Sequence, residues 1–121
     1  MKKVLVLEDE ADVRQTLCEQ LHQLGYLTLE ADNGEQALKM LDASPDIGMF
    51  ISDLMLPGNL SGAEVINHVR SHYPQLPVLL ISGQDLRPTH NPQLPDVALL
   101  RKPFTRVQLA QALRKVMTGT G

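Results

Sequence analysis

The 121-residue sequence contains no tryptophan and only four aromatic residues, two Tyr and two Phe. This scarcity argues against the aromatic platforms on which single-stranded nucleic acid stacks, and it means that any core must be mainly aliphatic. Basic residues are not in excess either, because 11 Lys and Arg are outnumbered by 14 Asp and Glu, which gives a net charge of −3. The charge balance argues against a protein that binds the phosphate backbone of nucleic acid through a basic face.

Cysteine and long apolar runs are also scarce. The single cysteine, Cys18, excludes an internal disulfide and a cysteine-based zinc site, and it is most simply a small packing residue. No apolar run reaches the length of about 18 residues that a membrane helix needs, and the first apolar stretch stops at Glu8. We therefore expect a soluble, cytoplasmic chain. Its length and its 43% of hydrophobic residues predict one domain over residues 1–121, with a frayed tail at 118–121.

Short apolar segments alternate with amphipathic ones along the chain. Strands are expected at residues 4–7, 26–30, 47–52, 78–81 and 97–100. Apolar residues at helical spacing predict a helix after the first, second, third and fifth of these strands, the last one capped by Thr105. Between the fourth and fifth strands, three prolines within residues 83–96 predict that the expected helix is short or absent. The alternation predicts an α/β fold with a five-stranded parallel sheet and helices on both faces.

The residues that could bind a ligand or take part in a reaction follow the strands. Glu8 and Asp9 come after the first strand, Asp53 after the third, Ser82 after the fourth and Lys102 after the fifth. In doubly wound sheets ligands bind beyond the carboxyl ends of the strands, and the strand order 2-1-3-4-5 places the first and third strands side by side there. Three carboxylates in one crevice repel one another unless a cation binds between them, and an oxygen-only ligand set suits Mg²⁺. We therefore predict a Mg²⁺ site.

A carboxylate beside Mg²⁺, with a hydroxyl on one side and an ammonium on the other, has the parts needed for phosphoryl transfer to an aspartate. Asp53 is the expected nucleophile, because its strand lies between the strand of the acid pair and the strands of Ser82 and Lys102. The metal and the lysine would neutralise the charge on the phosphoryl oxygens.

Four motifs in this order resemble the receiver domain of bacterial two-component response regulators, over essentially the whole chain. They are residues 4–10, residues 51–53 with Leu56-Pro57-Gly58, residues 80–83, and Lys102-Pro103-Phe104. The resemblance implies a flavodoxin-like (CheY-like) fold of order 2-1-3-4-5. It also implies that Asp53 accepts a phosphoryl group from the phosphohistidine of a histidine kinase or phosphotransfer protein, and that a downstream protein then binds the changed surface. The domain itself would contact neither nucleic acid nor membrane.

The resemblance further assigns roles within the site. Asp9, Asp53 and the backbone carbonyl of Met55 would coordinate Mg²⁺ directly, while Glu8 would act mainly through a bound water. Ser82 would bind the phosphoryl group and move when it arrives, Lys102 would pair with it, and the Lys102-Pro103 bond would be cis. Such a domain is not an enzyme for an external substrate, since it catalyses only its own phosphorylation and dephosphorylation.

Three departures from the common receiver pattern stand out. Leu99 occupies the place of an aromatic switch residue, the loop after Asp53 is one residue longer than usual, and the helix pattern within 83–96 is missing. Together these features resemble the receivers of hybrid sensor histidine kinases more than those of transcription factors. If the chain came from such a hybrid protein, the parent would be a histidine kinase.

Several alternative functions compete with the role of a phosphoacceptor domain. A receiver-like interaction module without regulated phosphorylation is compatible with Leu99, although the retained acid pair argues against it. A flavodoxin needs a glycine- and hydroxyl-rich phosphate loop where this chain has acids, and aspartyl-phosphate phosphatases usually carry a second aspartate where this chain has Met55. His68 and His72 lie four residues apart, but they have no apparent third ligand, and an exposed helix face is the favoured interpretation.

Overall fold

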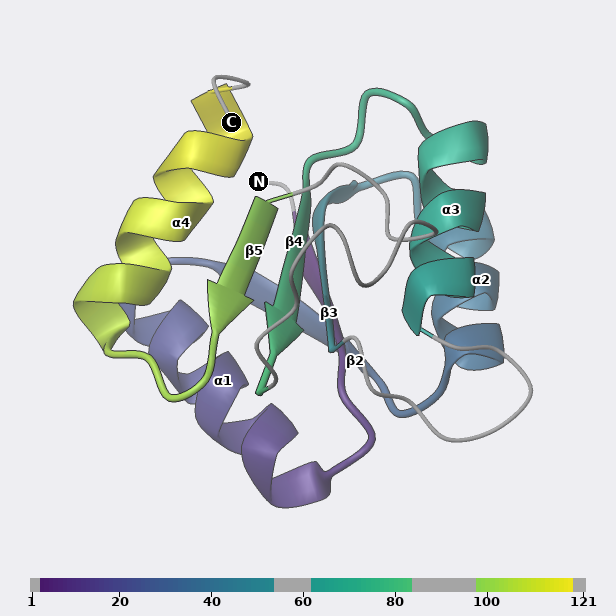
Figure 1. Ribbon diagram of the computed structural model, residues 1–121. Helices are drawn as coiled ribbons and strands as arrows, with labels where there is room; N and C mark the ends of the chain where they lie inside the picture. Colours follow the sequence, from purple (N-terminus) through teal and green to yellow (C-terminus); the bar gives the residue numbers. More distant parts are fainter. Residues whose placement is uncertain (1–2, 54–61, 84–97, 119–121) are drawn as a thin grey trace.

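Parallel strands form the centre of the structure (Figure 1). The computed structural model describes residues 3–53, 62–83 and 98–118. The sheet has the order β2-β1-β3-β4-β5, and every neighbouring pair is parallel, which confirms the predicted topology. The strands are β1 (Lys3–Leu7), β2 (Leu27–Ala31), β3 (Ile47–Asp53), β4 (Val78–Ser82) and β5 (Ala98–Arg101).

Helices cover both faces of this sheet, as predicted. Figure 1 shows α1 and α4 on one face and α2 and α3 on the other. Residues 84–97, where a helix was predicted to be short or absent, lie outside the described residues. The label α4 therefore denotes the helix that follows the fifth strand. It extends to residue 118, and the rest of the predicted tail, residues 119–121, is also not described. The helices are α1 (Ala11–Gln23), α2 (Gly34–Ala43), α3 (Gly62–His72) and α4 (Arg106–Thr118).

The sheet divides the core into two apolar clusters, because successive side chains of a strand point to opposite faces. In β1, Leu5 and Leu7 pack toward α2 and α3, whereas Val4 and Val6 pack toward α1 and α4. The central strands are apolar without interruption because both of their faces are buried. β5 lies at the edge of the sheet, where Leu99 is 37% exposed.

Local signals in the sequence account for the ends of the helices. The Asn33 side chain accepts a hydrogen bond from the backbone N–H of Gln36 at 2.8 Å and caps α2. Thr105 does the same for α4 through the N–H of Gln108, at 3.1 Å, as predicted. Gly25 follows α1 with φ of +95°, a conformation that side chains disfavour. The Asn33 and Thr105 caps lie at the carboxyl edge of the sheet, whereas the turn at Gly25 lies at the opposite edge, where α1 leads into β2.

A matched pair of leucines tests this account of the core. We expect Leu5→Ala to lower the free energy of unfolding by about 2–5 kcal/mol, because Leu5 is fully buried in β1. Leu27→Ala should lower it by less than about 1 kcal/mol, since Leu27 is 47% exposed on an edge strand. Urea unfolding followed by circular dichroism measures both values, and equal losses would contradict the assignment of the core.

Candidate functional site

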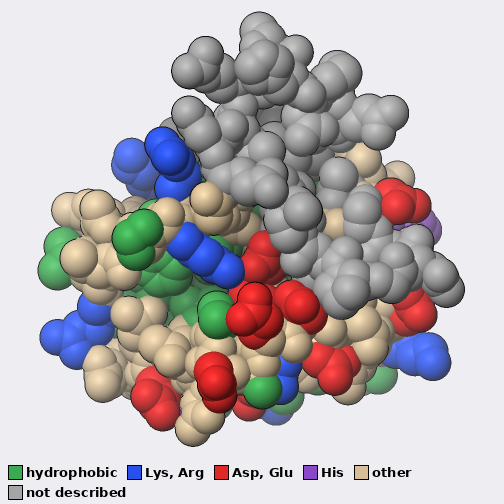
Figure 2. Space-filling view, turned by 60° about the horizontal axis from the view of Figure 1, so that its bottom comes forward, with side chains coloured by type: hydrophobic (Ala, Val, Ile, Leu, Met, Phe, Trp, Pro, Cys, Tyr) green, Lys and Arg blue, Asp and Glu red, His purple; other side chains and the backbone are tan. Residues whose placement is uncertain are grey.

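Five polar residues meet at the carboxyl edge of the sheet, because parallel strands all end there. Asp53 is the last residue of β3 and Ser82 the last of β4, while Glu8 and Asp9 follow β1 and Lys102 follows β5. Figure 2 looks onto this end of the molecule and shows acidic side chains gathered next to a hollow with apolar walls. The structure therefore brings together all the predicted site residues that it describes.

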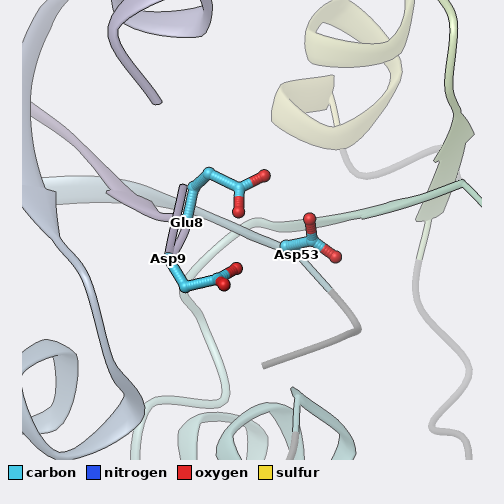
Figure 3. Close-up of side chains that lie close together, drawn as sticks. All are labelled: Glu8, Asp9 and Asp53. Carbon is cyan, nitrogen blue, oxygen red and sulfur yellow. The ribbon is translucent and has the colours of Figure 1, made fainter. Parts of the chain in front are cut away.

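Three carboxylates form the centre of the site. Oxygen atoms of Glu8, Asp9 and Asp53 lie within 4.8 Å of one another, and Figure 3 shows the three side chains close together, with Glu8 and Asp9 extending from the end of β1 toward Asp53 at the end of β3. Glu8 is 3% exposed and Asp53 is 8% exposed, whereas Asp9 is more open to solvent. This arrangement concentrates negative charge in a partly dehydrated place.

Lys102 compensates part of that charge. Its Nζ donates to Asp53 Oδ2 at 2.7 Å and to Glu8 Oε1 at 3.0 Å. Its backbone N–H donates to the carbonyl of Ser82 at 2.8 Å, which ties the residue after β5 to the end of β4. The Lys102-Pro103 bond is cis, as the resemblance implied. Ser82 is fully buried between the strand of Asp53 and the strand that precedes Lys102.

Burial and crowding shift the titration of these groups. Removal from water raises the pKa of Glu8 to about 7, and the nearby carboxylates of Asp53 and Asp9 add to this effect, while Lys102 and the N–H of Glu10 oppose it. Burial lowers the pKa of Lys102, but its bonds to Asp53 and Glu8 outweigh that effect and leave the pKa above its ordinary value. The lysine is therefore a permanent cation at neutral pH, whereas Glu8 exchanges protons there.

An apolar hollow of about 390 Å³ adjoins the carboxylates on the side of α1. Val13 and Leu17 of α1 line it together with Phe104, and Glu8 and Asp53 lie at its border. Apolar walls leave few dipoles to replace lost water, so they contribute to the raised pKa of Glu8.

The chemistry of the donor set fits a hard cation. Glu8, Asp9 and Asp53 offer only oxygen atoms, two of the three carboxylates are buried, and one lysine provides a single positive charge against them. Mg²⁺ prefers such ligands and usually keeps several waters beside one or two carboxylates. Met55, whose backbone carbonyl was predicted to join them, lies outside the described residues.

Other candidates from the sequence do not join the site. His68 and His72 lie on α3 with stacked rings 4.0 Å apart, and His72 Nδ1 is 3.0 Å from the carbonyl of His68. Among the described residues the one group of three or more metal-ligating side chains is the carboxylate cluster, so this pair gains no third ligand there. Cys18 is buried in the cluster beneath α1, in agreement with a packing role.

Arg14 also lies beside the site, although the sequence did not predict it. This residue of α1 donates from Nη1 to the backbone carbonyl of Glu8 at 2.7 Å and from Nε to Glu30 Oε1 at 3.0 Å. The sequence does place Arg14 in the first turns of a helix that follows an acid pair. However, the sequence of a polar helix face does not indicate which side chain reaches back to the preceding strand. Among the described residues, no helix is long and apolar enough to cross a membrane.

Comparison with known proteins places the chain in a family. The family model of the response regulator receiver domain matches residues 4–114. The response regulator receiver protein CpdR of Brucella abortus is 28% identical over 97% of this chain and 98% of its own length. A cyclic di-GMP phosphodiesterase of Thermotoga maritima is 33% identical over 68% of this chain, which spans only 21% of that protein.

A solved structure agrees with this assignment. The response regulator protein TrrA of Thermotoga maritima, in complex with Mg²⁺ and BeF, has a TM-score of 0.85 and 30% identity, with 96% of this chain and 99% of that one covered. The fold, the carboxylate cluster and the match over residues 4–114 together show that the chain belongs to the response regulator receiver domain family.

Proposed function

We propose that Asp53 accepts a phosphoryl group from the phosphohistidine of a histidine kinase or phosphotransfer protein. The observation that carries the proposal is the place of Asp53, which ends the central strand within the carboxylate cluster and bonds to Lys102 Nζ at 2.7 Å. Its carboxylate is thus fixed in direction and paired with a neighbouring cation. A nucleophile that attacks an anionic phosphoryl group needs both properties.

The transfer forms one bond and breaks another. A carboxylate oxygen of Asp53 attacks phosphorus, the bond between phosphorus and the imidazole nitrogen of the donor breaks, and the histidine leaves with the electron pair. Lys102 Nζ, which donates to Asp53 Oδ2 at 2.7 Å, would transfer this hydrogen bond to a phosphoryl oxygen. Ser82, at the end of the adjacent strand, would donate its hydroxyl to another phosphoryl oxygen.

Mg²⁺ is the proposed cofactor. Asp9, Asp53 and the backbone carbonyl of Met55 would hold it directly, and Glu8 would act mainly through a bound water. When bound, it supplies positive charge to the phosphoryl oxygens during transfer. The support for this proposal is the oxygen-only donor set and the structure of TrrA in complex with Mg²⁺ and BeF.

The proposed product carries close to two additional negative charges at the end of β3. New bonds to Ser82 and Lys102 would bias the neighbouring loops toward a second arrangement, which a downstream protein would recognise. We propose that residues 1–121 act as this one domain, in the cytoplasm, where histidine kinases present their phosphohistidine. Membership of a hybrid kinase stays a prediction from the sequence.

Intact-mass analysis after incubation with acetyl phosphate tests the phosphoacceptor. We expect a gain of one phosphoryl group in the presence of Mg²⁺ and none after its removal with a chelator. Asp53→Asn should abolish the gain because the amide cannot act as the nucleophile. The matched control is Asp46→Asn, at the opposite edge of the sheet beside Lys3, which should leave the gain unchanged. An adduct that persists in Asp53→Asn would refute the assignment, and if acetyl phosphate fails, a phosphohistidine donor provides the deciding trial.

Lys102→Met tests two effects of the lysine, one on the rate of phosphorylation and one on the affinity for Mg²⁺. We expect the rate of phosphorylation to fall at least about tenfold, because a charge-assisted hydrogen bond to the phosphoryl group is lost. Mg²⁺ should bind more tightly, since the ammonium no longer competes for Asp53 and Glu8. Stopped-flow kinetics and titration calorimetry measure these effects, with Lys39→Met on an exposed face of α2 as control. Weaker Mg²⁺ binding in Lys102→Met would contradict the proposed competition.

The raised pKa of Glu8 predicts how Mg²⁺ binding depends on pH. Below a pKa of about 7 the carboxyl group is protonated, so binding must release that proton and the affinity should fall by up to about tenfold per pH unit. Above the pKa the affinity should level off. Calorimetry between about pH 5.5 and 8.5 measures this profile, and Glu8→Gln should flatten it. A flat profile in the native chain would show that Glu8 does not titrate with the metal.

A further inference from the structure

We infer that Arg14 is a positioning residue for the metal site, because its guanidinium holds the peptide unit between Glu8 and Asp9 in place. This inference rests on the proposed function. The hydrogen bonds of Arg14 described above go to a backbone carbonyl and to Glu30, and not to the three carboxylates of the cluster. The juxtaposition that carries it is a single side chain that joins three elements, since Arg14 lies on α1 and bonds to the end of β1 and to Glu30 of β2.

The contacts of Arg14 use the fork geometry of the guanidinium. Nη1 donates to the carbonyl of Glu8 at 2.7 Å, and Nε donates to Glu30 Oε1 at 3.0 Å. The arginine side chain is 18% exposed, so these bonds are partly shielded from water. Glu30 is 51% exposed, and its ion pair with Nε fixes the orientation of the guanidinium. A lysine ammonium has several donors on one nitrogen, but it lacks the rigid planar fork that directs two different nitrogens to two separate acceptors.

The carbonyl of Glu8 matters because its peptide unit leads directly to Asp9. A peptide unit is planar, so fixing the carbonyl oxygen also fixes the plane from which the backbone of Asp9 continues. The other polar groups of Glu8 already have partners, since its N–H donates to Ala31, and its carboxylate accepts from Lys102 and from the N–H of Glu10. Arg14 therefore completes the restraint on the segment that carries two of the three carboxylates.

The position of Arg14 in α1 shows that helix stability does not explain it. It is the fourth residue of the helix, near an N-terminus whose dipole disfavours cations. The N-cap residue Glu10 makes no side-chain capping hydrogen bond, so the connection from β1 to α1 is not fixed by an ordinary cap. The contacts with the carbonyl of Glu8 and with the carboxylate of Glu30 together offset the unfavourable placement.

The sign of the effect on metal affinity distinguishes positioning from simple electrostatics. A cation close to a cation site weakens binding by repulsion, so removal of the Arg14 charge alone would tighten Mg²⁺ binding. Loss of a fixed carboxylate geometry has the opposite effect, because groups that orient metal ligands typically contribute about tenfold or more to affinity. The positioning role thus predicts weaker binding after a positive charge has been removed.

Titration calorimetry with Mg²⁺ on the full chain tests this inference. Arg14→Met keeps the apolar stem and the helix propensity, and we expect its affinity for Mg²⁺ to fall about tenfold. Arg14→Lys keeps the charge but loses the rigid fork of the guanidinium, so its affinity should lie between that of Arg14→Met and that of the native chain. Arg114→Met, which removes the same charge from an exposed position of α4, is the matched control and should bind Mg²⁺ like the native chain.

A second measurement needs no metal. Amide hydrogen exchange by NMR should be faster at Asp9 and Glu10 in Arg14→Met than in Arg114→Met, whereas exchange in the central strands should be unchanged. Unchanged or tighter Mg²⁺ binding in Arg14→Met, or equal exchange in the two variants, would overturn the inference. Failure of Arg14→Met to fold would also overturn it, because the role would then be general stability.

The phosphorylation assay separates this inference from the proposed function. At saturating Mg²⁺, Arg14→Met should still gain a phosphoryl group on Asp53, and only the Mg²⁺ concentration for half-maximal rate should rise. If the native chain is phosphorylated and Arg14→Met shows native Mg²⁺ affinity, the inference fails and the function stands. If the native chain neither binds Mg²⁺ nor gains a phosphoryl group, both fail together.

Discussion

Mutual repulsion among three carboxylates governs the architecture at the carboxyl edge of the sheet. Their oxygen atoms lie within 4.8 Å of one another, and two of the side chains are nearly inaccessible to water. Such a cluster persists only with positive charge or protons beside it, and here Lys102 and the raised pKa of Glu8 supply both. The cluster therefore keeps an excess of negative charge, which a divalent cation would neutralise.

The sheet topology holds the mutually repelling carboxylates together. In the order β2-β1-β3-β4-β5 the two strands that carry acids are neighbours, and the strands of Ser82 and Lys102 follow on one side. Apolar side chains on both faces of β1, β3 and β4 provide a rigid core in which the strand ends cannot drift apart. The stability for a locally unfavourable cluster therefore comes from the aliphatic core beneath it.

Much of the fold and of the site followed from the sequence. Uninterrupted apolar runs that end in an acid identified β1 and β3, and the same pattern placed Glu8, Asp9 and Asp53 together before any coordinates. Periodicity could not reveal Arg14, because a contact between a helix side chain and a backbone carbonyl leaves no pattern along the chain. The raised pKa of Glu8 was equally inaccessible, since it depends on burial that only the packed structure defines. The role of Met55 and the helix content of 83–96 stay predictions, because those residues are not described.

The bonds of Lys102 also have a consequence for the order in which the molecule assembles. They join residues 94 and 49 positions apart in the chain, so the lysine reaches its partners only after most of the polypeptide has been positioned. Closing such long loops is entropically costly, and parallel sheets, which depend on distant pairings, fold slowly. Until the last strand docks, the carboxylates face one another with no lysine between them. The charge compensation by Lys102 therefore exists only in a chain whose last strand has docked.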